Sequence, residues 1–598
     1  MADREGKEQE PANAAGTAMP SLEEMQHWTF VMGRAQQMML EHLADQMGQA
    51  AAQRPDPARA AMQWPGMNLF PDPAKVAQAQ VDLWTEGLNI WQRALGGGGG
   101  SSEIAEKADK DKRFAARQWQ ENPLFDMIRQ SYILISDRLL GSVDALEGVD
   151  DRTRERLRFA TRAFVDAMSP SNFALTNPLV IERTLETKGE NLLKGLEHML
   201  RDLSKGQLTH TDPNAFEVGR NIAVTPGKVV KQTPLYQLIQ YGPATDGVIE
   251  TPLVIFPPWI NRFYILDLNP KKSFIRWAVE QGLTVFMVSW KSADEGLKDV
   301  VMDDYVRAQI DAIDTIRDLL GVDAVHTIGY CVAGTTLAAT LALLAARGEG
   351  AKAASATFFT AQVDFSEAGD LALFVGDEQM EMIRQVSADK GYMDGRYMAA
   401  TFNLLRGRDL IWNYVVNNYL LGEDYPPFDL LHWNGDTTNL PAKWHQIYLQ
   451  QLYRENRLVQ PGGVTIDGAP IDLRKVETPT YVQAGREDHI APPQSVWKIT
   501  HHFRGPLRFV LAGSGHIAGV VNPPEAQKYQ YWTNEEKVDT LEDFIAGATE
   551  TKGSWWPDWI RWIESHGAKR VPAKGARVPG KGKLKALEDA PGSYVKAR

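Results

Sequence analysis

The chain of 598 residues has a single cysteine, Cys331. One thiol excludes an intrachain disulfide framework, and it excludes metal sites that are built from several cysteines. We therefore expect no structural metal site. A protein without disulfides suits the reducing cytosol, where a free thiol persists, so the sequence predicts a cytoplasmic location.

An excess of basic charge and a long apolar run are also missing. The 64 Lys and Arg residues are outnumbered by 76 Asp and Glu residues, and the net charge of −12 argues against a nucleic-acid partner. A small anionic substrate is still permitted, because it needs only a local basic patch. The best uncharged apolar run, 332–346, is shorter than the ~20 residues of a transmembrane helix, so no span is expected. The N-terminus has no apolar stretch behind a basic end, so no secretory signal is expected either.

The first 105 residues form a variable N-terminal region of irregular composition. Apolar residues there recur at three- and four-residue steps, which predicts an amphipathic helix that includes Met25, Trp28, Met32, Ala35, Met39 and Leu43. This helix either packs on its own domain or offers a methionine-rich face to a partner. The run Gly96 to Gly100, followed by two serines, predicts a flexible linker.

Two larger regions follow, with different patterns. Residues 106–220 read as a mainly helical domain punctuated by Asn-Pro pairs, and they contain no catalytic constellation. Residues 221–570 alternate short β-branched runs with helical stretches, which predicts an α/β fold with a mostly parallel sheet covered on both faces. The runs interpreted as buried strands are 253–256, 284–289, 324–328, 356–360, 480–483 and 507–511.

Cys331 lies in the sequence Gly-Tyr-Cys-Val-Ala-Gly, between a predicted strand and a predicted helix. This order is typical of a nucleophile elbow, where small neighbours permit a strained backbone at the nucleophile. The N-terminus of the helix would lie beside the sulfur and favour the thiolate. Ala333 replaces the usual final glycine, but it is small and Gly334 follows it. The pattern favours a catalytic Cys331, and the alternative is a small buried hydrophobic residue.

An acid and a histidine follow Cys331 in the order of an α/β-hydrolase triad. Asp488 comes after the predicted strand 480–483, and His516 comes after the predicted strand 507–511. We expect His516 to take the thiol proton, and Asp488 either to orient the imidazole or to act as a base itself. His489, next to the acid, is interpreted mainly as a residue that orders its loop.

Two further features belong to this predicted site. An oxyanion hole is expected from the backbone N–H of Val332 and, from the loop after strand 253–256, that of Ile260. The 156 residues between Cys331 and Asp488 exceed what one or two strand–helix units need, which predicts an inserted cap at about 364–439. A cap over the thiol would exclude water.

The combination of these motifs resembles a class I polyhydroxyalkanoate synthase, which makes poly(3-hydroxybutyrate) and related polyesters. The resemblance runs from about Phe114 to the C-terminus, and it is carried by GYCVAGT, GREDHIAPP, SGHIAGVVNPP, PPWINRFYILDL, FDLLHWNGDTTNLP and GSWWPDW. It implies an α/β-hydrolase core with a cap behind a helical N-terminal domain, homodimerisation, and residence at the surface of cytoplasmic polyester granules. It also implies no cofactor, because the acyl-CoA thioester is itself the substrate.

Residue by residue, the resemblance implies Cys331 as nucleophile, Asp488 as acid and His516 as base. It points to further positions around the site or its access: Asp267, Trp433, Tyr448, Tyr453 and Asn456. The expected reaction is polymerisation of (R)-3-hydroxyacyl-CoA, with 3-hydroxybutyryl-CoA as the short-chain substrate and CoA as the released product.

Three alternatives remain open at this stage. A thioesterase or other hydrolase on the same scaffold would need water to reach the acyl-enzyme. A catalytically inactive, granule-associated scaffold would instead use its methionine-rich and aromatic faces to coat the polymer. The basic segment 571–598 is read as a solvated tail, and the alternative is contact with CoA phosphates or with a granule protein through its lysines and arginines.

Overall fold

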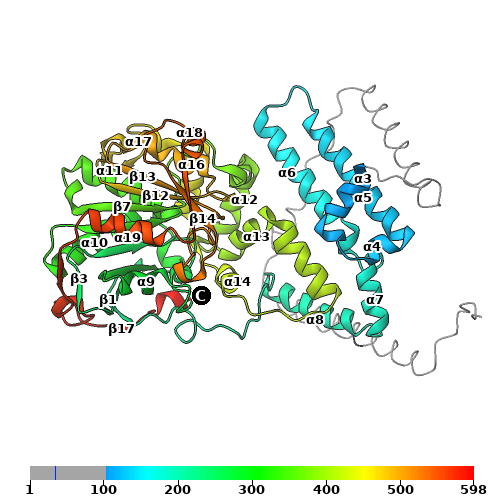
Figure 1. The fold of residues 1–598 in the computed structure, drawn as a ribbon, viewed down its shortest axis with the longest axis horizontal. Helices are drawn as coiled ribbons and strands as arrows, with labels where there is room; N and C mark the ends of the chain where they lie inside the picture. The colour runs from blue at the N-terminus through cyan, green and yellow to red at the C-terminus, as the bar shows by residue number, and fades with distance from the viewer. Residues whose placement is uncertain (1–33, 35–102) are drawn as a thin grey trace, which may run out of the picture.

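The computed structural model describes residue 34 and residues 103–598, and it places a helical domain beside an α/β domain (Figure 1). The predicted methionine-rich helix at 25–43 and the glycine linker at 96–100 lie outside the described residues.

The helical domain begins its helices at residues that suit helix N-termini. Asn122, Asp150 and Asn177 each accept a hydrogen bond from a backbone N–H of the first turn, and prolines occupy the first positions of two helices. A small core around Phe114 and Trp119 holds the first helices together. The helices are α3 (Glu103–Lys110), α4 (Gln118–Glu121), α5 (Pro123–Asp144), α6 (Asp151–Ala167), α7 (Pro178–Glu186) and α8 (Glu190–Lys205).

The α/β domain is built on an 11-stranded sheet in the order β15-β14-β13-β12-β7-β6-β4-β5-β2-β1-β17. The central strands are parallel, and all six predicted strands belong to them, which confirms the predicted fold class. They are β4 (Leu253–Phe256), β5 (Val285–Trp290), β6 (Val325–Tyr330), β7 (Ala353–Phe359), β12 (Thr480–Gly485) and β13 (Leu507–Ala512). Antiparallel strands flank them: β1 (Gly227–Gln232), β2 (Tyr236–Tyr241), β14 (Gln530–Thr533) and β15 (Thr549–Lys552).

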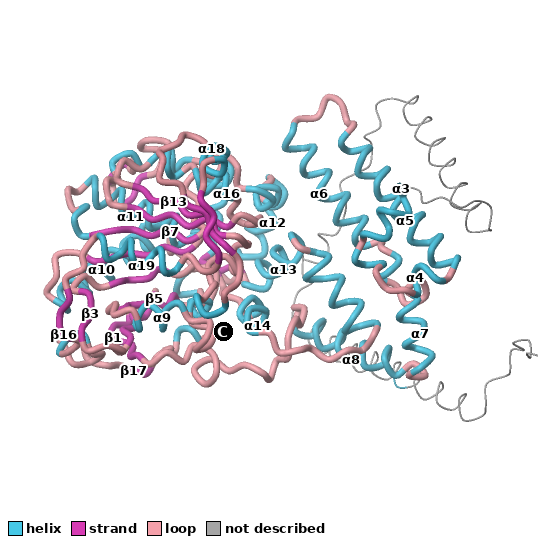
Figure 2. The backbone as a smooth tube through the Cα atoms, viewed as in Figure 1, coloured by secondary structure: helices cyan, strands magenta, loops and turns pink. Residues whose placement is uncertain are grey.

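Helices cover both faces of this sheet, as the strand-and-helix alternation predicts (Figure 2). Neighbouring residues of β7 point to opposite faces of the sheet. On one face Thr357 accepts a hydrogen bond from the Trp559 indole, and on the other Phe358 packs on Phe503. The covering helices are α9 (Phe274–Glu280), α10 (Met302–Leu320), α11 (Val332–Ala346), α16 (Pro493–Trp497), α17 (Ile499–His502), α18 (Leu541–Ala546) and α19 (Trp556–Ser565).

A largely helical cap is inserted between β7 and β12, and it is longer than the predicted 364–439. The strand pair β8 (Tyr392–Met393) and β9 (Leu440–Pro441) joins its two halves, so the cap continues past Asn439. Its helices are α12 (Asp377–Ala388), α13 (Gly395–Leu405), α14 (Asp429–Gly435) and α15 (Ala442–Tyr448), with the π-helices η8 (Arg408–Trp412), η9 (Val415–Leu420) and η10 (Leu449–Arg454). The cap extends beyond the predicted end because the next helix, α15, packs on α12 and β8 instead of returning directly to the sheet.

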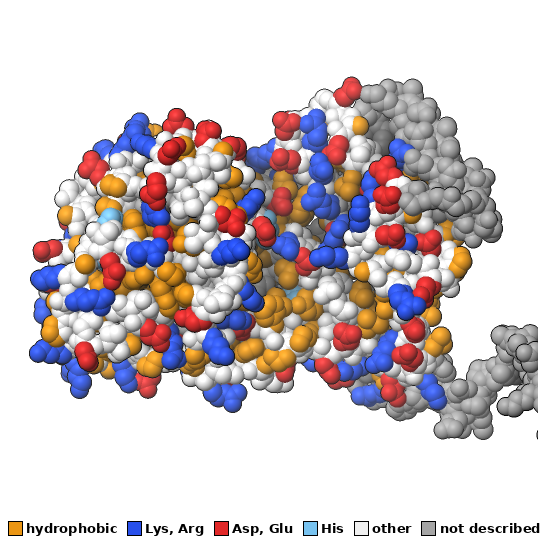
Figure 3. All heavy atoms as spheres, in the orientation of Figure 1, with side chains coloured by type: hydrophobic (Ala, Val, Ile, Leu, Met, Phe, Trp, Pro, Cys, Tyr) orange, Lys and Arg blue, Asp and Glu red, His pale blue; other side chains and the backbone are white. Residues whose placement is uncertain are grey.

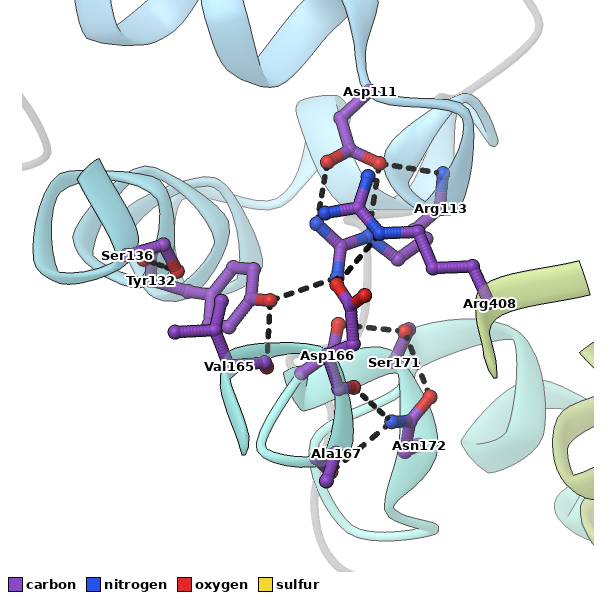
Figure 4. Close-up of polar contacts among 11 residues, drawn as sticks. Asp111, Arg113, Tyr132, Ser136, Val165, Asp166, Ala167, Ser171, Asn172 and Arg408 are labelled. Atoms are coloured by element: carbon purple, nitrogen blue, oxygen red, sulfur yellow. Dashed lines mark hydrogen bonds and ion pairs between the residues drawn. The ribbon is translucent and has the colours of Figure 1, made fainter. Parts of the chain in front are cut away.

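The helical domain contacts the cap. Arg408 of η8 donates a hydrogen bond to Asp166 of α6 over 2.6 Å, and Asp166 also accepts a hydrogen bond from Arg113 at 3.3 Å (Figure 4). The His210 ring nitrogen Nε2 lies 2.7 Å from the carbonyl of Leu410. Figure 3 shows charges of both signs interspersed over the viewed face, and hydrophobic side chains gathered where the two domains meet.

The segment 571–598 is not the solvated tail that the sequence suggests. Its strand β16 (Arg570–Pro572) pairs with β3 (Gly247–Ile249), and β17 (Glu588–Asp589) extends the main sheet beside β1. Arg577 and Val595 are buried. The basic composition suggested a solvated tail, but the buried Arg577 donates its hydrogen bonds to backbone carbonyls and needs no acidic side chain as a partner.

Acidification is expected to destabilise the fold through buried histidines. His326 in β6 is fully buried with Nδ1 2.8 Å from Ser355 Oγ, and burial lowers the pKa of His326, like that of His445, to about 4. The unfolded chain protonates these groups near pH ~6.5, so unfolding is favoured as the pH falls from there towards 4. One pKa unit corresponds to ~1.4 kcal/mol, so His326 alone should cost about 2 kcal/mol between pH 7 and 5.

Urea denaturation of the His326→Gln variant at both pH values tests this expectation. The variant should lose about 2 kcal/mol less unfolding free energy than the parent between pH 7 and 5. Equal pH dependence in the parent and in His326→Gln would contradict the assignment.

Candidate active site

Cys331 sits at the sharp turn between β6 and α11. Its φ of 53° and ψ of −128° are strained for a residue with a side chain, and its N–H donates to the carbonyl of Phe359 over 2.8 Å. A Cβ on Gly329 would collide with Gly334, and a Cβ on Gly334 would collide with Ala361. The close approach of strand and helix therefore depends on Gly334, which explains how the turn accommodates Ala333.

His516 and Asp488 form a buried pair at the carboxyl ends of β13 and β12. The Nδ1 atom of His516 lies 2.7 Å from Oδ2 of Asp488. The other carboxylate oxygen of Asp488 accepts the N–H groups of Ile490 and Ala491 at 2.8 and 2.9 Å. The hydroxyl of Tyr330 donates to the His516 carbonyl over 3.0 Å. Both side chains are thus held in a single orientation.

The charge balance at His516 favours its protonated form. Burial by itself lowers the pKa of His516, but the negative charges of Asp488 and Cys331 and the hydrogen bonds to both outweigh burial, and the net pKa lies well above the ordinary histidine value. The structure therefore brings the three predicted residues Cys331, His516 and Asp488 into one interacting group. That arrangement suits transfer of the thiol proton to the imidazole.

The two predicted oxyanion residues lie at the same edge of the sheet as Cys331. Val332 is the first residue of α11, so its N–H has no acceptor within the helix. Ile260 lies in the loop 257–262 after β4, and β4 is the parallel neighbour of β6. Two indole groups fix this loop at its ends: Trp290 donates to the carbonyl of Pro257 at 2.8 Å, and Trp433 donates to that of Arg262 at 2.7 Å. Trp433 is therefore an anchor of the loop.

An aromatic cluster lines the neighbourhood of the thiol. The rings of Trp259, Trp444 and Tyr448 lie with centroids 5.1 to 5.5 Å apart, and Tyr453 contacts Phe365 at 4.8 Å. Burial, and with it the charge of Cys331, raises the pKa of Tyr448 and that of Tyr453, so both hydroxyls lie within electrostatic reach of the sulfur.

Sequence reasoning named Tyr448 and Tyr453 but missed Trp444 and Phe365. Phe365 comes soon after the buried strand 353–359, so its strand-end position was a usable signal. No such signal exists for Trp444, because it reaches the cluster from the cap helix α15, whose position is set by tertiary packing.

Asp267, Asn456 and His489 have positions outside the triad. The buried Asp267 carboxylate accepts from Thr225 Oγ1 at 2.5 Å and from Ser273 Oγ at 2.6 Å, and it fixes the chain before β1. Asn456 ties the cap to the loop after β7 through the Phe365 N–H and the Asp364 carboxylate, both at 2.9 Å.

His489 adjoins the acid and is half-buried, and Asp488 is the largest of the charges that act on it. Burial is the main reason that the pKa of His489 is lowered, and Arg406 and Asp370 are among the charges that it senses. Within residues 103–598, no cluster of three or more His, Cys, Asp and Glu side chains could hold a metal ion.

Comparisons with known proteins identify the family. Residues 110–278 match the family described as the poly-beta-hydroxybutyrate polymerase (PhaC) N-terminus, and residues 262–523 match the alpha/beta hydrolase fold. A poly(3-hydroxyalkanoate) polymerase subunit of Rhizobium meliloti is 46% identical over 88% of this chain and 86% of its own length. The chain belongs to the poly(3-hydroxyalkanoate) polymerase family.

Other polymerases of this family are similarly close. That of Methylorubrum extorquens is 45% identical over 88% of both chains, and the subunit from Cupriavidus necator is 43% identical over 88% of this chain and 89% of its own. Since these polymerases are acyltransferases, the chain is an enzyme of that class. None of the helices among the described residues of this family member is long and apolar enough to cross a membrane.

Proposed function

We propose that this polymerase joins (R)-3-hydroxyacyl units, taken from their CoA thioesters, into a polyester and releases CoA, with 3-hydroxybutyryl-CoA as its short-chain substrate. The observation that carries the proposal is the sole cysteine of the chain, held in a strained turn within reach of the buried His516–Asp488 pair. The family membership supports the same reaction, since the relatives are poly(3-hydroxyalkanoate) polymerases.

In the first half-reaction, His516 accepts the thiol proton and Cys331 attacks the thioester carbonyl. The N–H groups of Val332 and Ile260 stabilise the oxyanion of the tetrahedral intermediate. The carbon–sulfur bond to CoA breaks, and His516 returns its proton to the leaving thiolate. The product is an acyl-enzyme thioester, which is close in energy to the substrate thioester because the broken and formed bonds are of the same kind.

In the second half-reaction, the 3-hydroxyl group of another acyl unit gives its proton to a base and attacks the acyl-enzyme carbonyl. The ester bond forms, the carbon–sulfur bond to Cys331 breaks, and the Cys331 thiolate is regenerated. Sequence reasoning left His516 and Asp488 as alternative bases. The structure favours His516, because one oxygen of Asp488 is engaged by His516 and the other by two backbone N–H groups. A relay of the chain between two thiols would require two subunits, since each chain has one cysteine.

The buried site supports polymerisation over hydrolysis. Cys331 is only 9% exposed, and the hydroxyls of the cap residues Tyr448 and Tyr453, whose ring centroids lie 5.6 Å apart, sense its charge. Water is therefore a poor competitor for the acyl-enzyme. We further propose that the enzyme acts as a homodimer at the surface of cytoplasmic polyester granules, where granule-associated proteins could bind its N-terminal region.

Incubation with (R)-3-hydroxybutyryl-CoA tests the proposal. Released CoA should be matched by insoluble polyester, with less than about one-tenth of the acyl groups recovered as free hydroxy acid, because water is excluded from the site. Free acid in equal amount to CoA would instead support a hydrolase, and the absence of CoA release would support a catalytically inactive scaffold. Either of these outcomes contradicts the proposed function.

A further inference from the structure

The loop that carries Ile260 ends at Arg262, whose side chain is fully buried. An arginine at this position has five N–H donors to satisfy, and a buried guanidinium without partners is strongly destabilising. Its partners come from two distant parts of the chain, the cap and the segment 594–598. This setting makes Arg262 the point where the oxyanion loop, the cap and the C-terminal segment meet.

The contacts of Arg262 are mostly with backbone carbonyls. One terminal nitrogen donates to the carbonyl of Ala597 at 2.6 Å and to that of Thr437 in the cap at 3.1 Å, and the other donates to the carbonyl of Tyr594 at 3.3 Å. Nε lies 3.4 Å from Asp436 Oδ1, which is an ion pair without hydrogen-bond geometry. Carbonyl partners require that the backbone of 594–597 itself be fixed in place.

The segment 594–598 is fixed on the sheet and on the cap. The Tyr594 hydroxyl donates to the carbonyl of Thr233 at 2.7 Å, and the Tyr594 N–H donates to Gln237 of β2 at 3.1 Å. Arg598 lies 3.1 Å from Asp436, whose carboxylate also accepts the Tyr264 hydroxyl at 2.8 Å. The segment thus connects β2 and the turn before it to the loop that follows β4.

We propose that Arg262 and the segment 594–598 position the oxyanion loop, so that the Ile260 N–H is correctly placed for acylation of Cys331. The inference rests on the proposed function, since it assigns the loop to the thioester reaction. Arg262 is a positioning residue: it touches no reacting atom and acts through the loop two residues away. Its loss should lower the acylation rate while the thiol and the His516–Asp488 pair stay intact.

Two variants and a matched control test this inference in the full-length enzyme. Arg262→Met removes the donors, and deletion of residues 594–598 removes two of the accepting carbonyls. Arg577→Met is the control, because Arg577 is also a buried arginine that donates to backbone carbonyls, at 3.2 Å to Ile249 and 2.6 Å to Glu250. Those carbonyls precede β4, at the opposite end of that strand from the oxyanion loop.

The two readouts separate the oxyanion loop from the nucleophile. Acylation is measured as CoA released in a single turnover of (R)-3-hydroxybutyryl-CoA, by quenched flow with enzyme in excess. Alkylation by iodoacetamide reports the thiol alone, because Cys331 is the only cysteine and the displacement forms no carbonyl oxyanion. Both rates are compared at a temperature where thermal denaturation shows every variant to be folded; if Arg262→Met does not fold, Arg262→Lys replaces it.

We expect Arg262→Met and the deletion to slow acylation by about 10- to 100-fold, as a misplaced or lost oxyanion donor does, with alkylation within about twofold of the parent. Arg577→Met should change neither rate by more than about threefold, since it does not touch the site. Unchanged acylation in a folded Arg262→Met variant overturns the inference, and so does an equal loss of alkylation. The failure of the proposed function is distinct, because the parent enzyme would then give no CoA release or no polyester.

Discussion

Replacement of Cys331 by alanine is expected to abolish CoA release from (R)-3-hydroxybutyryl-CoA, with a loss of roughly 10⁴-fold or more. The chain holds no second thiol that could replace the nucleophile. His516 and Asp488 remain in the variant, but without the sulfur no acyl-enzyme forms and the oxyanion hole alone supports only background turnover. The measurement is free CoA over several hours at saturating substrate.

The fold of this variant can be checked independently. Alanine fits the elbow at least as easily as cysteine, since the strained backbone and the glycine contacts of the turn do not involve the sulfur. We therefore expect a melting temperature close to that of the parent. Continued CoA release by a folded Cys331→Ala variant would contradict the assignment of Cys331 as the nucleophile.

Replacement of His516 by glutamine should reduce polymerisation by about 10³- to 10⁴-fold, because the proton of the thiol then has no acceptor. The same variant should also react slowly with iodoacetamide, since less thiolate is formed when the imidazole is gone. This second effect distinguishes His516 from Arg262, whose loss should leave alkylation intact. CoA release and alkylation, measured on the same sample, check both points.

His489 offers the matched comparison for His516. Both imidazoles sense the charge of Asp488, but the contact of 2.7 Å to the carboxylate is made by Nδ1 of His516. His489→Gln should therefore keep the rate within about tenfold of the parent, as expected for a residue that neither donates nor accepts the reacting proton. A larger loss in His489→Gln than in His516→Gln would reverse the assignment of the base.

Much of the catalytic core is predictable because its signals are local. The strand 253–256 is observed with the predicted ends, and the other five predicted strands differ by a few residues at most. Cys331, Asp488 and His516 each follow a buried strand, and parallel neighbours place such strand ends at one edge of the sheet. The order of the three residues was therefore enough to expect them together.

The cap and the C-terminal segment were harder to predict because their contacts are non-local. Trp444 packs on Trp259, 185 positions earlier in the chain, and Arg262 bonds to carbonyls more than 330 positions later. Carbonyl partners leave no signature in side-chain chemistry, so a basic segment that packs by its backbone reads like a solvated one. The end of the cap was predicted too early for a similar reason, because β9 and α15 are short elements that are stabilised by contacts with β8 and α12.

The sequence by itself determined the fold class and the positions of the central strands, and it predicted that Cys331, Asp488 and His516 would meet at strand ends, because hydrophobic periodicity and strand-end motifs lie within short windows of the chain. Only the tertiary structure decided the role of Gly334 at the elbow, the aromatic surroundings of the thiol and the anchoring of the Ile260 loop by Arg262. These features depend on atoms from distant parts of the chain meeting within a few ångströms, and such meetings are set by packing of the whole molecule.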